Sequence, residues 1–297
     1  MSAASASRVV ALLPAWNAER FIAPVLACLA AQTHRSFDVL ISDDASTDRT
    51  AAICAAFARD HANVHLIRQP RNLGWIGNVN ALLREARGDH FFFAFHDDLV
   101  HPTYVERLSG ALDAHPHAVL TFSDMVRRVV APDDDAGAIA PAAPGPDDVK
   151  VYLDLEGVRE RLARGRIVAA KWGRPPSYSV MLANRGVFRA SAARAVGGLR
   201  RHAGGEFGAD WPWLLALALR GDFVRVPSPL VEKTYRPTSL SATWRHSLRE
   251  RAGVLLSCHR EVARAALPLG EACALHRALL VGAARRQWWA LHKRSHR

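Results

Sequence analysis

Short apolar segments alternate with helix-like segments through the first third of this chain, and this alternation restricts the fold more than any other feature. The apolar segments are strand candidates at Val9–Leu13, Phe37–Ile41, Val64–Ile67 and Phe91–Phe95. Parallel neighbours in a sheet need a long connection, usually a helix, whereas antiparallel neighbours need only a short turn. The alternation therefore predicts an α/β fold with a mostly parallel central sheet and helices on both faces.

Polar side chains follow each predicted strand at its carboxyl end. They lie in Pro14–Asn17, Asp43–Asp48, Asn72–Gly74 and His96–Asp98. In open α/β sheets, ligands bind in the crevice beyond the carboxyl ends of the strands. We therefore expect a binding site at this edge, although the adjacent carboxylates Asp97 and Asp98 also suit an ordinary acidic turn after a core strand.

In this order and at these spacings, the four polar segments resemble those of the inverting family 2 glycosyltransferases, which have the GT-A fold. That family has Pro-x-Tyr-Asn, Asp-Asp-Gly-Ser-x-Asp, Asn-x-Gly and an Asp-x-Asp site after its first four strands. The resemblance is densest up to Pro102. It implies a GT-A fold and the transfer of a sugar from a nucleotide-diphosphate sugar, expected to be a UDP-sugar, to a hydroxyl group.

The resemblance also implies roles for individual residues on the donor side. One aspartate, Asp43 or Asp44, would bind the base, and Asp97 would ligate Mg²⁺ or Mn²⁺, hard cations that prefer oxygen ligands. The enzyme would then be a metal-dependent glycosyltransferase of the hexosyltransferase type. The other positions expected to contact the donor are Pro14, Trp16, Asn17, Asn72, Gly74, His96, Asp98 and Arg236.

Several positions depart from the family pattern, three of them with consequences for the donor side. Phe95 stands where the family has the first aspartate of Asp-x-Asp, so His96 or Asp98 would have to replace that carboxylate. Ala45 replaces a glycine, which suggests that the turn there needs no positive φ. Arg236 replaces a histidine; arginine cannot ligate a cation but can clamp a diphosphate, and a plain surface arginine is the alternative.

On the acceptor side, Asp210 is the candidate general base. The segment Glu206–Trp211 resembles the family's Glu-Asp-Trp motif, whose aspartate deprotonates the acceptor hydroxyl. A base is needed because a sugar hydroxyl is a poor nucleophile until its proton is leaving. The alternative for Asp210 is a carboxylate that merely favours a helix N-terminus, and Glu206 is a weaker alternative base.

Residues 1–243 are expected to form one GT-A domain. Its nucleotide-sugar half would span 1–125 and its acceptor half 126–243, with a flexible insert at 131–150 that is rich in Pro, Gly and Asp. Residues 244–297 are expected to form a basic helical C-terminal extension of two helices split near Pro268, the first with Leu248, Ala252, Leu255 and Val262 on its apolar face.

The extension carries most of the excess positive charge. The chain has a formal net charge of +11, and residues 245–297 hold eleven Lys and Arg against three Glu. Paired tryptophans at 288 and 289 among cations would suit an anionic membrane surface, where lipid-linked acceptors are found; the alternative is a helix packed on the domain with a solvated basic face. No nucleic-acid-binding motif accompanies the charge, so we expect no nucleic-acid partner.

The remaining features indicate a cytoplasmic protein, expected at most to lie peripherally on the inner face of the plasma membrane. No apolar run is long enough to span a bilayer, and the four cysteines show no metal-site spacing. Together, these observations predict an inverting glycosyltransferase that acts on a saccharide or lipid-linked acceptor in bacterial-type surface glycan or glycolipid assembly. The alternative is a catalytically silent nucleotide-sugar-binding or scaffold protein of the same fold, suggested by Phe95 and by Ala209, which stands in place of the glutamate of the Glu-Asp-Trp motif.

Overall fold

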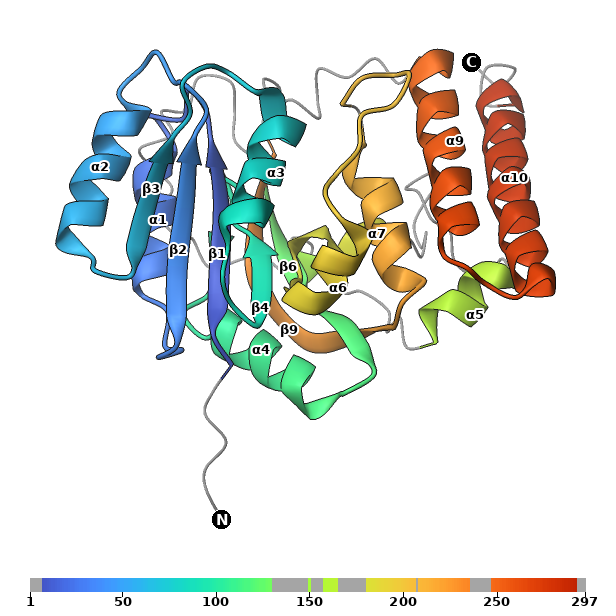
Figure 1. Cartoon of the computed structure of the whole chain (residues 1–297), viewed down its shortest axis with the longest axis horizontal. Coiled ribbons are helices and arrows are strands. Elements are labelled where there is room, and N and C mark those ends of the chain that lie inside the picture. The colour runs from blue at the N-terminus through green and yellow to red at the C-terminus, as the bar shows by residue number, and fades with distance from the viewer. Residues whose placement is uncertain are drawn as a thin grey trace.

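The computed structural model describes residues 7–129, 149–150, 157–164, 180–206, 208–235 and 247–292. The described strands form one nine-stranded sheet in the order β3-β2-β1-β4-β8-β6-β9-β5, with β7 (Val149–Lys150) paired to β6 outside that path. Figure 1 shows the sheet with helices packed around it and a helical hairpin at the C-terminal side. The predicted α/β fold is confirmed.

The first half of the sheet is parallel, as predicted. Its strands are β1 (Val9–Ala15), β2 (Phe37–Asp43), β3 (Val64–Arg68) and β4 (His90–Phe93). They are connected by α1 (Ile22–Ala30), α2 (Thr50–Asp60) and α3 (Gly74–Glu85). In Figure 1, α3 lies in front of the sheet and α1 behind it. All four carboxyl ends therefore meet at one edge.

The second half of the sheet is mixed. Strand β8 (Val187–Arg189) is antiparallel to β4, and Phe188 pairs with Phe91. Because this pairing is antiparallel, the residues just before β8 lie at the carboxyl end of β4. The other described elements here are β5 (Leu99–Val100), α4 (Tyr104–Ala114), β6 (Ala118–Val129), α5 (Val158–Ala163), the 3₁₀ helix η3 (Val180–Arg185), α6 (Ala190–Val196), α7 (Asp210–Ala218) and β9 (Asp222–Tyr235).

Aromatic rings join the two halves beneath the site. The ring centroids of Phe93, Phe188 and Trp213 lie 5.1–5.4 Å from one another. These side chains come from β4, β8 and α7 and are buried in the core. Aromatic pairs at such distances add to the stabilisation from burial. The carboxyl end of β4 and the N-terminal part of α7 therefore pack on one shared aromatic cluster.

The C-terminal extension is a pair of helices, α9 (Leu248–Arg264) and α10 (Leu269–His292), which confirms the predicted split near Pro268. Of the residues predicted for the apolar face of α9, Val262 is buried but Leu248 is 70% exposed, and the side that packs on the domain also carries Val254 and Cys258. The helix approaches the domain through Gly253, where an added Cβ would lie 2.5 Å from His202 Nδ1. Close approach at the glycine turns that face inward and leaves Leu248 outside.

Several sequence-based predictions lie outside the described residues, among them most of the insert at 131–150, Arg236, and the side chains of Trp288 and Trp289. Within the described part of the chain, no helix is long and apolar enough to span a membrane. The cysteines Cys28, Cys54, Cys258 and Cys273 are free thiols.

Candidate functional site

The loops that follow β1 and β2 are held together by hydrogen bonds. Asn17 Oδ1 accepts a hydrogen bond from Thr47 N at 2.9 Å, and Asn17 N donates to Ser46 Oγ at 3.0 Å. Asn17 itself has φ of 46°. The side chain of Asn17 therefore orders this edge, while Trp16 beside it is 53% exposed.

The turn after β2 corrects one prediction. Ala45 has φ of 56°, so the inference that this turn needs no positive φ is wrong. A non-glycine residue in the left-handed region costs free energy and is kept only where its surroundings fix it. Here the hydrogen bonds between the two loops, together with the 3.4 Å contact from Ser46 N to Asp43 Oδ2, fix the turn.

The two aspartates at the end of β2 are both buried but differ in their contacts. Asp44 Oδ1 accepts a hydrogen bond from Leu73 N at 2.8 Å. Burial raises the pKa of Asp44, and the N–H groups of Leu73 and Gly74 oppose that rise. Asp43 Oδ1 is buried without a hydrogen-bond partner among the described residues. Such an acceptor is costly to leave unpaired, so it is a candidate partner for a ligand or water N–H or O–H.

The loop after β3 is clamped from the acceptor side of the sheet. Gly74 has φ of 75°, and an added Cβ would lie 2.9 Å from Glu206 Oε1. Asn72 Oδ1 accepts from Gly74 N at 2.9 Å, and Glu206 Oε1 accepts from Ile76 N at 3.3 Å. Arg201 pairs with Glu206 at 2.8 Å. Glu206, the alternative base, is thus committed to the N-terminus of α3, which begins at Gly74.

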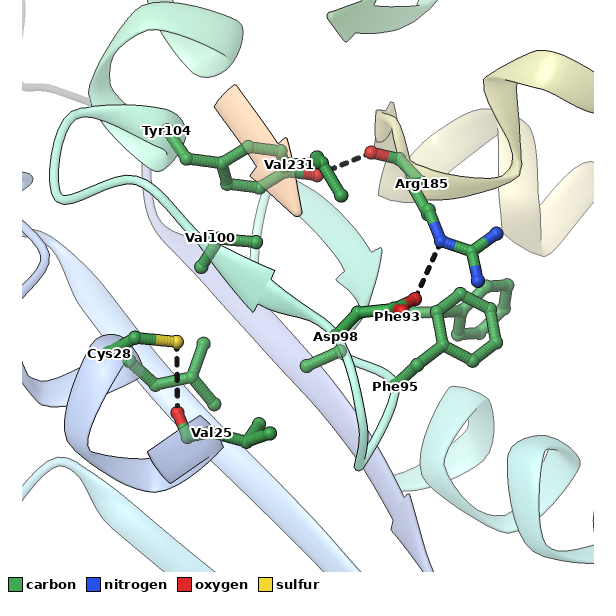
Figure 2. Close-up of a pocket in the computed structure, with 11 residues that line it drawn as sticks. Val25, Cys28, Phe93, Phe95, Asp98, Val100, Tyr104, Arg185 and Val231 are labelled. Carbon is green, nitrogen blue, oxygen red and sulfur yellow. Dashed lines mark hydrogen bonds and ion pairs between the residues drawn. The ribbon is translucent and has the colours of Figure 1, made fainter. Parts of the chain in front are cut away.

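The turn after β4 separates its two aspartates. Asp98 is buried: its Oδ2 accepts from Arg185 Nε at 2.6 Å and its Oδ1 from Thr234 N at 3.1 Å. His96 and Asp97 are only partly buried. Figure 2 shows Asp98 facing Arg185, with Phe95 beside the guanidinium. Of the two carboxylates, Asp97 is the one placed nearer to solvent.

Asp210 lies at the N-terminus of α7 and is connected to the same turn. Its Oδ2 accepts a hydrogen bond from Asn184 Nδ2 at 3.2 Å, and Asn184 Oδ1 accepts one from Arg185 Nη1 at 2.8 Å. Burial raises the pKa of Asp210, and the Asn184 hydrogen bond and the Arg185 charge oppose that rise. A partly buried carboxyl group with a raised pKa suits a general base.

The side chains at the turn after β4 were compared with the ligands that a divalent metal ion needs. Among the described residues, no group of three or more His, Cys, Asp or Glu side chains is arranged to hold one. Mg²⁺ and related ions are often bound by one or two carboxylates together with waters and substrate phosphates. Asp97, with His96 beside it, fits that smaller role, whereas Asp98 is already committed to Arg185.

A cavity lies behind the turn after β4 (Figure 2). Its polar lining is limited to Cys28, Asp98, Tyr104 and Arg185, and the rest is apolar: Val25, Leu29, Phe93, Ala94, Phe95, Val100 and Val231. Cys28 Sγ and the Tyr104 hydroxyl are already used, in contacts with Val25 O and Arg185 O. The cavity therefore lacks the free polar groups that a nucleotide requires.

Sequence reasoning did not identify the roles of Arg185 and Asn184. The one local signal is the position of Arg185 two residues before a strand. Its partner Asp98 lies 87 residues away, so only the pairing of β8 with β4 brings them together.

Comparisons with known proteins find relatives of this chain in sequence. Residues 11–133 match the family model described as "Glycosyl transferase family 2". "Putative glycosyltransferase EpsE" of Bacillus subtilis is 28% identical over 123 residues, which cover 41% of this chain and 44% of that protein. The chain spans less than half the length of the first relatives that it matches in sequence.

Solved structures share the fold. Staphylococcus aureus TarS 1–349 in complex with UDP-GlcNAc has a TM-score of 0.68 at 18% identity, and the match covers 92% of this chain and 71% of that one. The mannosyltransferase PcManGT from Pyrobaculum calidifontis, in complex with GDP-Man and Mn²⁺, has a TM-score of 0.53 at 18% identity, with 95% and 74% covered. These likenesses confirm the predicted GT-A fold, and the family match confirms the resemblance over residues 11–133.

Proposed function

Since residues 11–133 match the model of glycosyl transferase family 2, we propose that this chain transfers a sugar, with inversion, from a nucleotide-diphosphate sugar to a hydroxyl acceptor. One observation carries the proposal. The partly buried carboxylate Asp210 is linked by hydrogen-bonded side chains to the turn that bears Asp97. A base and a site for the departing diphosphate therefore lie at the same edge of the sheet.

In the proposed reaction, Asp210 accepts the proton of the acceptor hydroxyl as its oxygen attacks the anomeric carbon. The bond from that carbon to the diphosphate oxygen breaks, and the nucleoside diphosphate leaves from the opposite face, so the configuration inverts. Burial supports this role, because a raised pKa makes Asp210 a stronger proton acceptor while the Asn184 hydrogen bond favours its ionised form.

We propose a UDP-sugar as the donor, held at the ends of β1 and β2. Pro14, Trp16 and Asn17 would line the nucleotide pocket, and Asp43 or Asp44 would accept the N–H of the base. The unpartnered, buried Asp43 Oδ1 supports an acceptor role at this position. The complex of the structurally similar TarS with UDP-GlcNAc supports the choice of nucleotide.

Asp97 is the residue that would hold Mg²⁺ or Mn²⁺, with His96 or the donor's own oxygens completing the ligands. The cation would neutralise negative charge on the leaving diphosphate. The complex of the structurally similar PcManGT with GDP-Man and Mn²⁺ supports a metal in this fold. Arg236, outside the described residues, keeps its proposed role as a clamp on the diphosphate.

We propose that the acceptor is a saccharide or a lipid-linked saccharide of a bacterial-type surface glycan, reached at the inner face of the plasma membrane. The described surface of α10 supports membrane contact. Leu269 and Leu280, about three helical turns apart, are 80% and 56% exposed, and Arg277 between them is also exposed. Apolar and cationic side chains on one helix favour an anionic membrane surface.

Thermal stabilisation by nucleotides tests the proposed donor. UDP, GDP, dTDP and CDP are each added with and without Mn²⁺, to the wild-type protein and to Asp97→Ala. Metal-dependent stabilisation by UDP that is lost in Asp97→Ala is the expected result. Stabilisation by UDP without sugar transfer would favour the silent binding protein, and no stabilisation by any nucleotide would contradict both.

A further inference from the structure

Arg185 is held in place by contacts that its own backbone and its neighbours make. It is the last residue of η3, and its carbonyl oxygen accepts a hydrogen bond from the Tyr104 hydroxyl at 2.7 Å. The next residue is Gly186, where an added Cβ would lie 2.4 Å from Thr121 O. The backbone at Arg185 is thus fixed against both α4 and β6.

The guanidinium of Arg185 is fixed as well. Its Nε donates to Asp98 Oδ2 at 2.6 Å, and its central carbon lies 4.5 Å from the ring centroid of Phe95. The side chains of Arg185 and Asp98 are 12% and 5% exposed. A charge-assisted hydrogen bond at this distance, combined with stacking on an aromatic face, orients the guanidinium strongly.

This orientation passes to Asp210 through one amide. Arg185 Nη1 donates to Asn184 Oδ1 at 2.8 Å, so the other end of that amide, Nδ2, points its hydrogens toward Asp210 Oδ2 at 3.2 Å. A guanidinium can only donate, which sets which end of the amide faces it. Arg185 thus holds the Asn184 amide in the orientation in which its Nδ2 donates to Asp210 Oδ2.

On these contacts, and resting on the proposed function, we propose that Arg185 is a positioning residue that orients the base Asp210 through Asn184 and anchors the base to the turn at Phe95–Asp98. Nothing in the family-like motifs assigns this role. It gives a physical account of Phe95, whose ring supplies the face on which the guanidinium stacks where a carboxylate would otherwise stand.

Loss of activity alone would not test this role, because a buried ion pair can also stabilise the fold without acting on the base. A readout that reports on Asp210 itself is therefore needed. The titration of Asp210 supplies one that requires no turnover. Its carboxyl carbon, labelled with ¹³C and identified by comparison with Asp210→Asn, is followed against pH by NMR. The described charges that act on Asp210 are those of Arg185 and Lys233. We expect Arg185→Gln to raise the pKa of Asp210 by about one unit.

A matched control is available in the same sheet. Arg225 makes a bidentate, largely buried pair with Asp124, with Nε–Oδ1 and Nη2–Oδ2 distances of 2.8 and 2.6 Å. Arg225→Gln should lower stability to a similar extent and leave the titration of Asp210 unchanged. Arg185→Lys keeps the charge without the fork and guards against loss of folding; it should shift the titration less than Arg185→Gln does.

A double-mutant cycle of Arg185 and Asn184, measured by the kinetics of sugar transfer, is the decisive test. Arg185→Gln and Asn184→Ala are each expected to lower kcat by about tenfold or more with little change in donor affinity, and the double variant should be no slower than the slower single variant. Multiplying effects, or a titration of Asp210 that Arg185→Gln does not move, would overturn the inference. A wild-type protein that transfers no sugar would refute the proposed function instead, and the titration would still decide the role of Arg185.

Discussion

The Arg185–Asp98 pair makes a quantitative prediction about stability. Both side chains are nearly inaccessible to water, so removal of Asp98 leaves a cation buried without its counter-charge. Such a loss typically costs about 3–5 kcal/mol of the free energy of unfolding. Arg185 would keep its contacts with Asn184 and Phe95, which places Asp98→Ala toward the lower end, at about 3 kcal/mol.

Replacement of the whole pair should behave differently. When both charges are replaced by apolar side chains of similar volume, as in Asp98→Leu with Arg185→Met, the desolvation cost of the ions disappears along with their attraction. The double variant is therefore expected within about 1 kcal/mol of the wild-type protein, or more stable. The single variant should thus be less stable than the double one.

Urea unfolding measures these differences by linear extrapolation. The control is Glu271→Ala, which removes a more exposed pair with Arg159, whose side chains are 23% and 49% exposed. Its cost should be below about 1 kcal/mol, as for surface ion pairs. A loss below about 1 kcal/mol for Asp98→Ala as well would refute the reasoning, since it would mean that water reaches the pair.

Three further predictions follow from other parts of the molecule. Burial and the neighbouring His276 lower the pKa of His259, so stability should fall as pH drops through the ordinary histidine pKa of about 6.5; His259→Gln should flatten this fall in melting temperature, and an unchanged slope would contradict it. Gly186→Ala should destabilise by about 1–3 kcal/mol in urea because its Cβ would meet Thr121 O at 2.4 Å; a neutral effect would show that β8 can shift. Trp213→Ala should lower the free energy of unfolding by about 3–5 kcal/mol because its ring packs on Phe93 and Phe188. A cost near zero would contradict the packing of the aromatic cluster described above.

The parallel half of the fold was predictable from the sequence because its signals are local. Each buried strand is a short apolar run, and each ends in polar residues that a sheet edge collects. Local patterns also placed the two C-terminal helices. They did not show which face of α9 is buried, because that depends on the close approach of Gly253 to His202.

The site was predictable to a smaller extent. The motif positions lie at the expected edge. The sequence did not show that Asp98 forms an ion pair with Arg185 or that Asn17 links two loops. Those contacts join residues far apart in the chain. The positive φ of Ala45 was also missed, because alanine ordinarily adopts a negative φ. The hydrogen bonds of Asn17 to Ser46 and Thr47 outweigh that preference.

The central claim is that Asp210 is the base of an inverting sugar transfer, and the most direct measurement compares wild-type protein with Asp210→Asn. The donor is the sugar nucleotide whose diphosphate stabilises the protein, and both turnover and the anomeric configuration of the product are recorded. The account predicts an inverted product and, for Asp210→Asn, a loss of kcat by about 10²–10⁴-fold with unchanged donor affinity. Full turnover by Asp210→Asn, or a product that retains the donor's configuration, would contradict it.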